Sequence, residues 1–284
     1  MTDTSEAQGQ ALAPPSCSLF LGDCLDVMAR LEDGSINAII TDLPYGTTAC
    51  KWDAVIPFSP MWEQVRRLLK TNGVFVTTAS QPFTSALVMS NPNMFKHEWV
   101  WIKNRGSNFA NTVREPMKEH ESVLVFSQGK WTYNRQMQPR AESGLARAAY
   151  GVEHNDQDRE TYRKFEGRAR HTISELRVPS SWQKFNIAAG KEKTKHPTQK
   201  PLELMRYMVR TYTNPGDVVL DPCMGSGTTC LAAKLEGRGY IGIEREPKYF
   251  EKAKTRIEGD ADLFSANDQL CSNEQQRLVS EVEK

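Results

Sequence analysis

Features typical of membrane, secreted and metal-binding proteins are missing from this chain of 284 residues. No apolar run approaches the roughly 20 residues of a membrane-spanning helix, and the first residues lack the basic and apolar regions of a signal peptide. The six cysteines are scattered, with no Cys-x-x-Cys pair and no histidine at zinc-ligand spacing, which indicates neither a disulfide framework nor a structural metal. We therefore expect a soluble protein of the reducing cytoplasm, with no metal and no membrane partner.

An excess of one charge is also missing from the chain as a whole, whose formal net charge is +1, but it is present locally. Residues 130–200 hold fifteen Lys and Arg against eight Asp and Glu, with aromatic residues such as Trp131, Tyr133 and Trp182 between them. This combination is typical of a surface that faces nucleic acid. The plainer alternative is a solvated loop of ordinary charge. No sustained period appears in residues 130–195, which indicates an irregular insertion.

Strand-like and helix-like runs alternate along the rest of the chain, which predicts an α/β fold with a doubly wound, mostly parallel sheet. Asn72 and Gly73 should end the second helix, and residues 103–121 form a loop longer than a hairpin needs. Strands are expected at 18–21, 36–42, 74–78, 98–102, 122–126, 217–221 and 240–243, and helices at 25–31, 57–69, 83–89, 201–209, 230–235 and 247–257.

Two short motifs, each placed directly after an apolar strand, carry the chemistry. The first is Asp42-Leu43-Pro44-Tyr45, and the second is the glycine turn from Asp221 to Thr229. Together they resemble the catalytic turn and the S-adenosylmethionine loop of the amino-methyltransferases that act on DNA. Their order, with the catalytic turn first, matches the circularly permuted β class of that family. The resemblance covers residues 17–257.

The resemblance implies a Rossmann-like methyltransferase fold with a seven-stranded sheet in the family order 3-2-1-4-5-7-6. Strands one and four are neighbours in that order, so the two motifs should lie side by side although about 180 residues separate them. The expected organisation is a disordered arm at 1–16, a catalytic half at 17–129, a target-recognition region at 130–195, a cofactor-binding half at 196–257 and a polar tail at 258–284.

The first motif suits an exocyclic amine, whose lone pair is delocalised into the base. Two acceptors, the Asp42 carboxylate and the Leu43 carbonyl, would hold the N–H groups so that the lone pair is restored, while Pro44 stiffens the turn. Tyr45 would stack on the base, worth about 1–3 kcal/mol. The family usually has proline in place of Leu43, but only a carbonyl is needed there. Aspartate at the first position favours adenine N6 over cytosine N4.

The second motif and two further stretches resemble the family's cofactor pocket. Glu244, at the end of the next strand, would accept both ribose hydroxyls, and the resemblance assigns the remaining contacts to the adenine and methionine parts of the cofactor. The cofactor-binding residues are Asp23 and Cys24 before the first helix, Thr198 and Lys200 in the run from His196 to Pro201, Asp221, Cys223, Gly225, Ser226 and Gly227 in the glycine loop, and Glu244.

Each of these stretches has a competing interpretation. A dinucleotide fingerprint would need a glycine where Cys230 stands, and the glycine loop could be a tight structural turn. Asp23 could serve only as a helix N-cap. Cys223 follows a proline, as does the nucleophilic cysteine of cytosine-C5 methyltransferases, but here it lies inside the cofactor loop.

The sequence as a whole is interpreted as a site-specific DNA methyltransferase that moves a methyl group from S-adenosylmethionine to N6 of an adenine flipped out of duplex DNA. Such an enzyme would act in the cytoplasm of a bacterial or phage-infected cell, in restriction-modification. N4-cytosine methylation, RNA methylation and a catalytically silent DNA-binding relative remain alternatives. The recognition sequence, a homodimer and a restriction partner all stay open at this stage.

Overall fold

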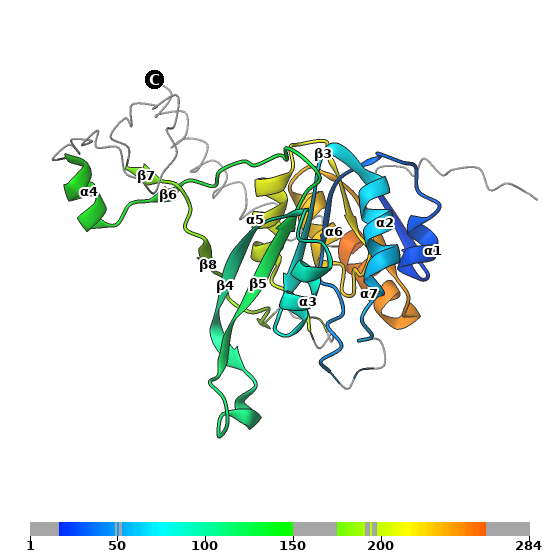
Figure 1. The fold of residues 1–284 in the computed structure, drawn as a ribbon, viewed down its shortest axis with the longest axis horizontal. Coiled ribbons are helices and arrows are strands. Elements are labelled where there is room, and N and C mark those ends of the chain that lie inside the picture. The colour runs from blue at the N-terminus through cyan, green and yellow to red at the C-terminus, as the bar shows by residue number, and fades with distance from the viewer. Residues whose placement is uncertain are drawn as a thin grey trace, which may run out of the picture. The chain divides into compact units, whose positions relative to one another are not determined.

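The computed structural model describes residues 17–48, 50, 53–149, 175–190, 194 and 198–259 (Figure 1). The expected arm at 1–16, His196 and Pro197, and all of the expected tail beyond residue 259 lie outside the described residues. The chain divides into two compact units. Described residues up to Asn134 and from Ser181 onward form the larger unit, and those within Arg135–Ser180 belong to the smaller one.

An eight-stranded sheet forms the centre of the larger unit, in the order β1-β10-β9-β2-β3-β5-β4-β8. Neighbouring strands are parallel except where β5 pairs with β3 and with β4. The strands are β1 (Cys17–Leu21), β2 (Ile36–Thr41), β3 (Leu69–Ala79), β4 (Phe95–Ser107), β5 (Lys118–Phe126), β8 (Trp182–Lys184), β9 (Val218–Asp221) and β10 (Gly239–Glu244).

The first seven of these strands follow the expected family order, and the eighth differs from the expectation. β8 pairs in parallel with β4, where Val100 faces Trp182 and Ile102 faces Lys184. Only Gln183 of this three-residue strand is buried, so the segment carries no apolar alternation from which a strand could be predicted.

Helices cover both faces of the sheet, because successive side chains of a strand point to opposite faces and both faces are apolar here. In β5, Val123 and Val125 enter one core cluster, while Leu124 and Phe126 enter the other. The first cluster lies under α5 (Leu202–Tyr212), α6 (Thr228–Leu235) and α7 (Pro247–Gly259), and the second lies under α1 (Cys24–Met28), α2 (Phe58–Leu68) and α3 (Phe83–Ser90). No described helix is long and apolar enough to cross a membrane.

The second predicted helix ends earlier than expected. α2 ends at Leu68, β3 begins at Leu69, and Asn72 and Gly73 lie inside the strand rather than at a helix end. The register between β2 and β3 shifts at this point, since Ile36 faces Leu69 and Ala38 faces Val74. Asn72 and Gly73 therefore belong to an irregular part of β3 that fits more residues against a shorter stretch of β2.

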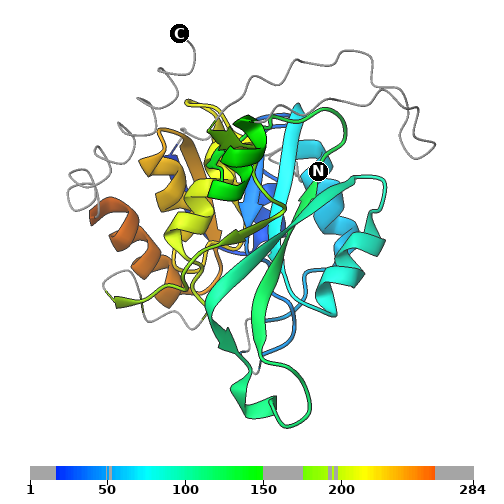
Figure 2. The same cartoon turned by 90° about the vertical axis from the view of Figure 1, so that its left-hand side faces the viewer.

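Nine of the 19 residues of the predicted loop at 103–121 are strand. β4 runs on to Ser107 and β5 begins at Lys118, so only residues 108–117 connect them, with a short 3-10 helix η1 at Phe109–Asn111. The two strands project beyond the sheet as a narrow arm, which Figures 1 and 2 show from two sides. The side chains here are mainly exposed and polar, so hydrophobic periodicity gave no signal for these strand extensions.

The smaller unit lies within the predicted target-recognition region. Its described residues form a two-stranded antiparallel ribbon of β6 (Gln138–Pro139) and β7 (Leu176–Arg177), together with the helix α4 (Glu142–Ala149). The backbone N–H of Arg140 donates to the Glu175 carbonyl at 2.8 Å and extends the ribbon by one bond.

Candidate active site

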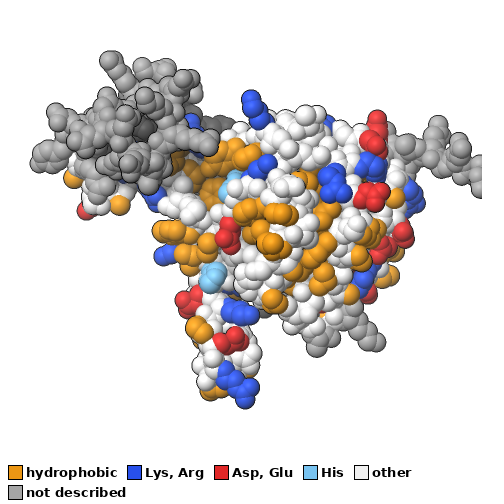
Figure 3. Space-filling model, viewed as in Figure 1, with side chains coloured by type: hydrophobic (Ala, Val, Ile, Leu, Met, Phe, Trp, Pro, Cys, Tyr) orange, Lys and Arg blue, Asp and Glu red, His pale blue; other side chains and the backbone are white. Residues whose placement is uncertain are grey.

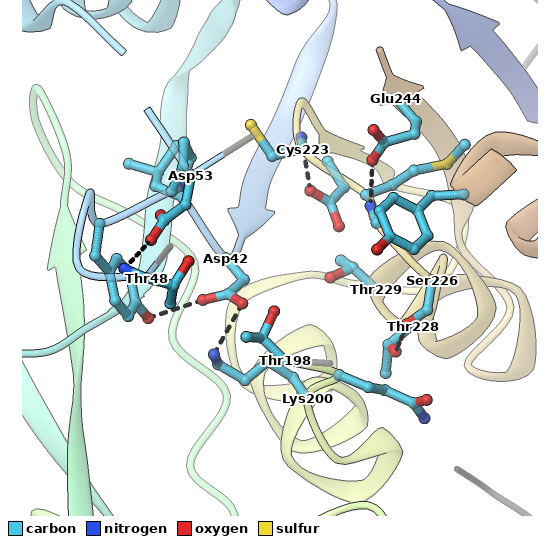
Figure 4. A pocket seen from close by; sticks show the side chains of 18 of the residues that line it. Asp42, Thr48, Asp53, Thr198, Lys200, Cys223, Ser226, Thr228, Thr229 and Glu244 are labelled. Atoms are coloured by element: carbon cyan, nitrogen blue, oxygen red, sulfur yellow. Dashed lines mark hydrogen bonds and ion pairs between the residues drawn. The ribbon is translucent and has the colours of Figure 1, made fainter. Parts of the chain in front are cut away.

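A cavity of about 620 Å³ opens at the carboxyl ends of β2, β9 and β10 (Figure 4). β2 and β9 are neighbours in the sheet, and the chain winds away from them in opposite directions, which is where doubly wound folds bind ligands. The Thr41 hydroxyl, at the end of β2 directly before the first motif, donates to Asp221 Oδ1 of the second motif at 2.7 Å. Of the fourteen predicted site residues, all but Gly227 line this cavity.

The Asp42 carboxylate is held by three donors. Its Oδ1 accepts from the Tyr45 hydroxyl at 2.8 Å and from the Thr78 hydroxyl, and its Oδ2 accepts from Lys200 Nζ at 2.8 Å. Burial, together with the charges of Asp42 and Glu121, raises the pKa of Tyr45 well above its ordinary value. The phenol therefore stays protonated and remains a donor to Asp42.

Lys200 lies between two carboxylates. Its Nζ lies 2.8 Å from Asp42 Oδ2 and 3.4 Å from Glu121 Oε2, and it sits over the Tyr45 ring, 5.5 Å from the centroid. Burial alone would lower the pKa of Lys200, but the two carboxylates outweigh it and raise the pKa above its ordinary value. Lys200 is a fixed cation on the Asp42 side of the cavity, and its contact with the methionine carboxylate stays a prediction.

A second ion pair extends this arrangement into the arm. Lys103 Nζ donates to Glu121 Oε1 at 2.5 Å and lies 5.1 Å from the centroid of the Trp101 ring. Sequence analysis missed Lys103, Glu121 and Thr78. A signal for two of them was present, because Lys103 directly follows one predicted strand and Glu121 directly precedes the next. The antiparallel pairing of these strands sets them side by side.

Asp53 anchors the turn that follows the first motif, and sequence analysis missed it too. Its carboxylate accepts from the backbone N–H groups of Gly46, Thr47 and Thr48 at 2.9, 3.0 and 2.6 Å. Burial would raise the pKa of Asp53, but hydrogen bonds from Thr48 and the neighbouring backbone lower it below its ordinary value. A carboxylate that accepts three N–H groups fixes the loop that carries Tyr45.

The glycine loop is built around two buried carboxylates at strand ends. Glu244 Oε2 accepts from the Gly225 N–H at 2.9 Å, and Oε1 accepts from the Glu246 N–H at 2.8 Å. Asp221 Oδ1 accepts from the Cys223 N–H at 3.1 Å. Burial raises the pKa of Asp221 to about 7, against the lowering effect of the Thr41 and Thr229 hydroxyls.

Gly227 supports the loop from behind the cavity. It caps α6 with a φ of +73°, and a Cβ placed on it would lie 2.8 Å from Ile257 Cδ1 on α7. A side chain at this position would collide with α7 and would also strain the backbone. The glycine therefore serves the packing of α6 against α7, while Ser226, Thr228 and Thr229 present the start of α6 to the cavity (Figure 4).

The structure bears on two of the competing interpretations. Asp23 Oδ1 accepts from the Leu25 N–H at 2.9 Å and caps α1. The capping role is therefore confirmed, and the contact of Asp23 with adenine stays a prediction beside it. The Cys223 thiol is hydrogen-bonded to that of Cys24. This contact, burial and the charges of Asp221 and Glu244 raise the pKa of Cys223 well above its ordinary value. Such a thiol is a poor nucleophile at neutral pH.

The chain is similar in sequence and in fold to known methylases. The family model described as DNA methylase matches residues 36–255 and so includes both motifs. Type II methyltransferase M.HpaI of Haemophilus parainfluenzae is 26% identical over 275 residues, which cover 90% of this chain and 80% of that protein. Type II methyltransferase M1.MboII of Moraxella bovis is 28% identical over 247 residues, which cover 81% and 92%. The crystal structure of the M1.HpyAVI-SAM complex is 29% identical with a TM-score of 0.55, over 84% of this chain and 99% of that one.

Proposed function

The chain belongs to the DNA methylase family, and from this premise we propose that it methylates N6 of an adenine flipped out of duplex DNA. The observation that carries the proposal is the meeting of Asp42 and the glycine loop in one cavity, although 179 positions separate Asp42 from Asp221 in the chain. An amine acceptor and a cofactor loop must be neighbours if a methyl group is to pass directly between their ligands.

S-adenosylmethionine is the cofactor, and when bound it supplies the methyl group from its sulfonium centre. The residues of the cavity suit it. Glu244 is a buried carboxylate at the end of β10 that accepts the backbone N–H groups of Gly225 and Glu246. A carboxylate has about four lone-pair sites, so it can also accept from a ribose hydroxyl. The first turn of α6 offers N–H groups and the positive end of a helix dipole to a carboxylate.

Asp42 would orient the target amine. Oδ1 already accepts from Tyr45 and Thr78, whereas Oδ2 accepts only from Lys200 among the contacts of the described residues. A carboxylate oxygen has two lone pairs, so Oδ2 is the atom that accepts an N–H of the base. The Leu43 carbonyl accepts the second N–H. The Leu43 side chain is buried in the core, and this burial fixes the turn.

Tyr45 would stack on the base from a fixed position. Its ring is stacked on Phe83, with centroids 5.2 Å apart, and its hydroxyl is tied to Asp42. The aspartate at the first motif position favours adenine over cytosine by resemblance to the family. Residues 130–195 are proposed as the target-recognition region, on the basis of their excess of basic residues.

The proposal is tested by transfer of labelled methyl from S-adenosylmethionine to unmethylated duplex DNA and to RNA of matched sequence. Wild-type protein should label the duplex and leave the RNA unlabelled. Asp42→Ala should lose the label but bind S-adenosylmethionine close to wild type, because the carboxylate touches the amine and not the cofactor. Labelled RNA, or an Asp42→Ala variant with substantial activity on DNA, would overturn the proposal.

A further inference from the structure

The end of the β4–β5 arm carries large apolar side chains in solvent. Phe109 is 77% exposed and Val113 is 88% exposed. Both lie between the two strands of the arm, in the connection at 108–117. Figure 3 shows hydrophobic and basic side chains together at this projecting end of the molecule. Exposed apolar groups of this size at one tip indicate a contact with another molecule.

The tip is ordered by polar contacts rather than by a core of its own. Asn108 adopts a left-handed conformation with φ of +67°, and its side-chain amide donates to Glu115. The N–H groups of Arg114 and Glu115 both donate to the Asn111 carbonyl, at 2.9 and 3.1 Å. These bonds hold the turn in shape while they leave Phe109 and Val113 uncovered. A side chain presented in this way is pre-organised for contact.

The arm itself is closely packed below the tip. Gly106 of β4 lies against Met117, the residue before β5, and a Cβ on Gly106 would come within 2.4 Å of Met117 Cγ. The glycine allows the two strands to approach at this point. The arm is therefore a narrow ribbon, and a two-stranded ribbon is one of the elements that the major groove of DNA admits.

The position and charge of the arm indicate which molecule it contacts. Ser107, Asn108 and Lys118, where the two strands of the arm meet the connection between them, line the cavity that contains Asp42. Between residues 104 and 118 there are three cations, Arg105, Arg114 and Lys118, and one carboxylate, Glu115. All three cations are exposed. Exposed cations at the rim of a base-binding cavity complement the phosphates that flank a target base.

We propose that the tip of the arm enters the duplex beside the target and that Phe109 and Val113 fill the gap in the base stack that the flipped base leaves. This inference rests on the proposed function, because only an enzyme that works on an extruded base leaves such a gap. Apolar side chains act as wedges between base steps in other DNA-binding proteins. Asp42 and Tyr45 would then hold the extruded base while the tip prevents its return.

The test compares a Phe109→Ala, Val113→Ala double variant with a control variant, Met89→Ala. Met89 is also apolar, 73% exposed and outside the cavity. The substrates are two duplexes with the recognition site read from the methylated DNA of expressing cells. In one the target adenine is paired with thymine, and in the other it faces an abasic position, where extrusion is easier. The double variant should lose about tenfold or more in rate on the paired duplex and recover to near the wild-type rate on the abasic one.

Other outcomes separate this inference from its rivals. An unchanged rate on the paired duplex, or an equal loss on both duplexes, would overturn the proposal that Phe109 and Val113 fill the gap in the base stack. An equal loss accompanied by a change from dimer to monomer in sedimentation would assign the tip to a second copy of the chain instead. If the wild-type enzyme labels neither duplex, the proposed function fails, and the inference about the tip of the arm fails with it. Met89→Ala should match wild type throughout, and both variants should bind S-adenosylmethionine as wild type does.

Discussion

Lys200 Nζ lies 2.8 Å from Asp42 Oδ2, so Lys200 holds the carboxylate that we propose as the acceptor of the target amine. The same ammonium lies 3.4 Å from Glu121, which is paired with Lys103. Four charges of alternating sign thus run from the base of the arm to the first motif, in the order Lys103, Glu121, Lys200 and Asp42. The arrangement keeps the Asp42 carboxylate in one orientation, as the proposed binding of a target amine by Oδ2 requires.

Lys200→Met should destabilise the protein by on the order of 3 kcal/mol, because it leaves two carboxylates, Asp42 and Glu121, without the cation buried between them. Urea unfolding measures the change. Lys254→Met, at an exposed position of α7, is the matched control and should cost less than about 0.5 kcal/mol. Similar losses in the two variants would mean that the buried ion pair adds nothing to stability.

Glu244→Ala should weaken the binding of S-adenosylmethionine about tenfold or more, since a lost charged hydrogen bond costs about 1.5–3 kcal/mol. Calorimetry measures the affinity. Glu246→Ala removes an acid two residues away that does not line the cavity, and it should bind the cofactor as wild type does. Unchanged affinity in Glu244→Ala would remove Glu244 from the cofactor site.

Asp221 predicts a pH dependence of stability with a definite sign. Its folded pKa is raised to about 7 by burial, so between about pH 4 and pH 7 the unfolded chain loses this proton while the folded protein keeps it. The free energy of unfolding therefore falls as pH rises through this window, by at most about 1.4 kcal/mol per pH unit.

The side chain that replaces Asp221 in an Asp221→Asn variant does not titrate, so the variant should lose the part of the pH dependence of the unfolding free energy that comes from Asp221. Urea unfolding of both proteins at about pH 5 and about pH 7 should show wild-type stability falling relative to the variant as pH rises. A wild-type stability that stays constant or rises relative to that of the variant as pH rises would show that Asp221 is ionised in the folded state.

Cys223→Ser should keep methyl transfer near the wild-type rate. The thiol is half-buried and hydrogen-bonded to Cys24, and its pKa is raised well above the ordinary value, so it is a poor nucleophile at neutral pH. Steady-state rates on duplex DNA check this. Complete loss of activity in a folded variant would reopen the nucleophilic interpretation of this cysteine.

The order of the sheet could be predicted because each strand of its centre is an uninterrupted apolar run and the two motifs fix which strands are neighbours. Ala38 and Ile39 pair with Val219 and Leu220 as that order requires. The eighth strand and the arm could not be predicted. Their residues are largely solvated, and an exposed strand stabilised by pairing leaves no periodic apolar signal.

The site was predictable where a motif marks it and not where the fold alone assembles it. Asp42, Tyr45 and Glu244 stand in the cavity as their motifs suggest. The pairing of Lys200 with Asp42 joins residues 158 positions apart, and no spacing in the sequence indicates it. Asp53 is similar, because an acid that anchors a loop looks like any other polar loop residue until the backbone path is known.

The most direct measurement is mass spectrometry of nucleosides from duplex DNA that the enzyme has methylated with labelled S-adenosylmethionine. An Asp42 carboxylate and a Leu43 carbonyl that hold the amine of adenine predict N6-methyladenine as the labelled product, and no label in the digest of DNA treated with Asp42→Ala. Label found only in N4-methylcytosine would contradict the assignment of the base, and label in C5-methylcytosine would contradict the mechanism as well.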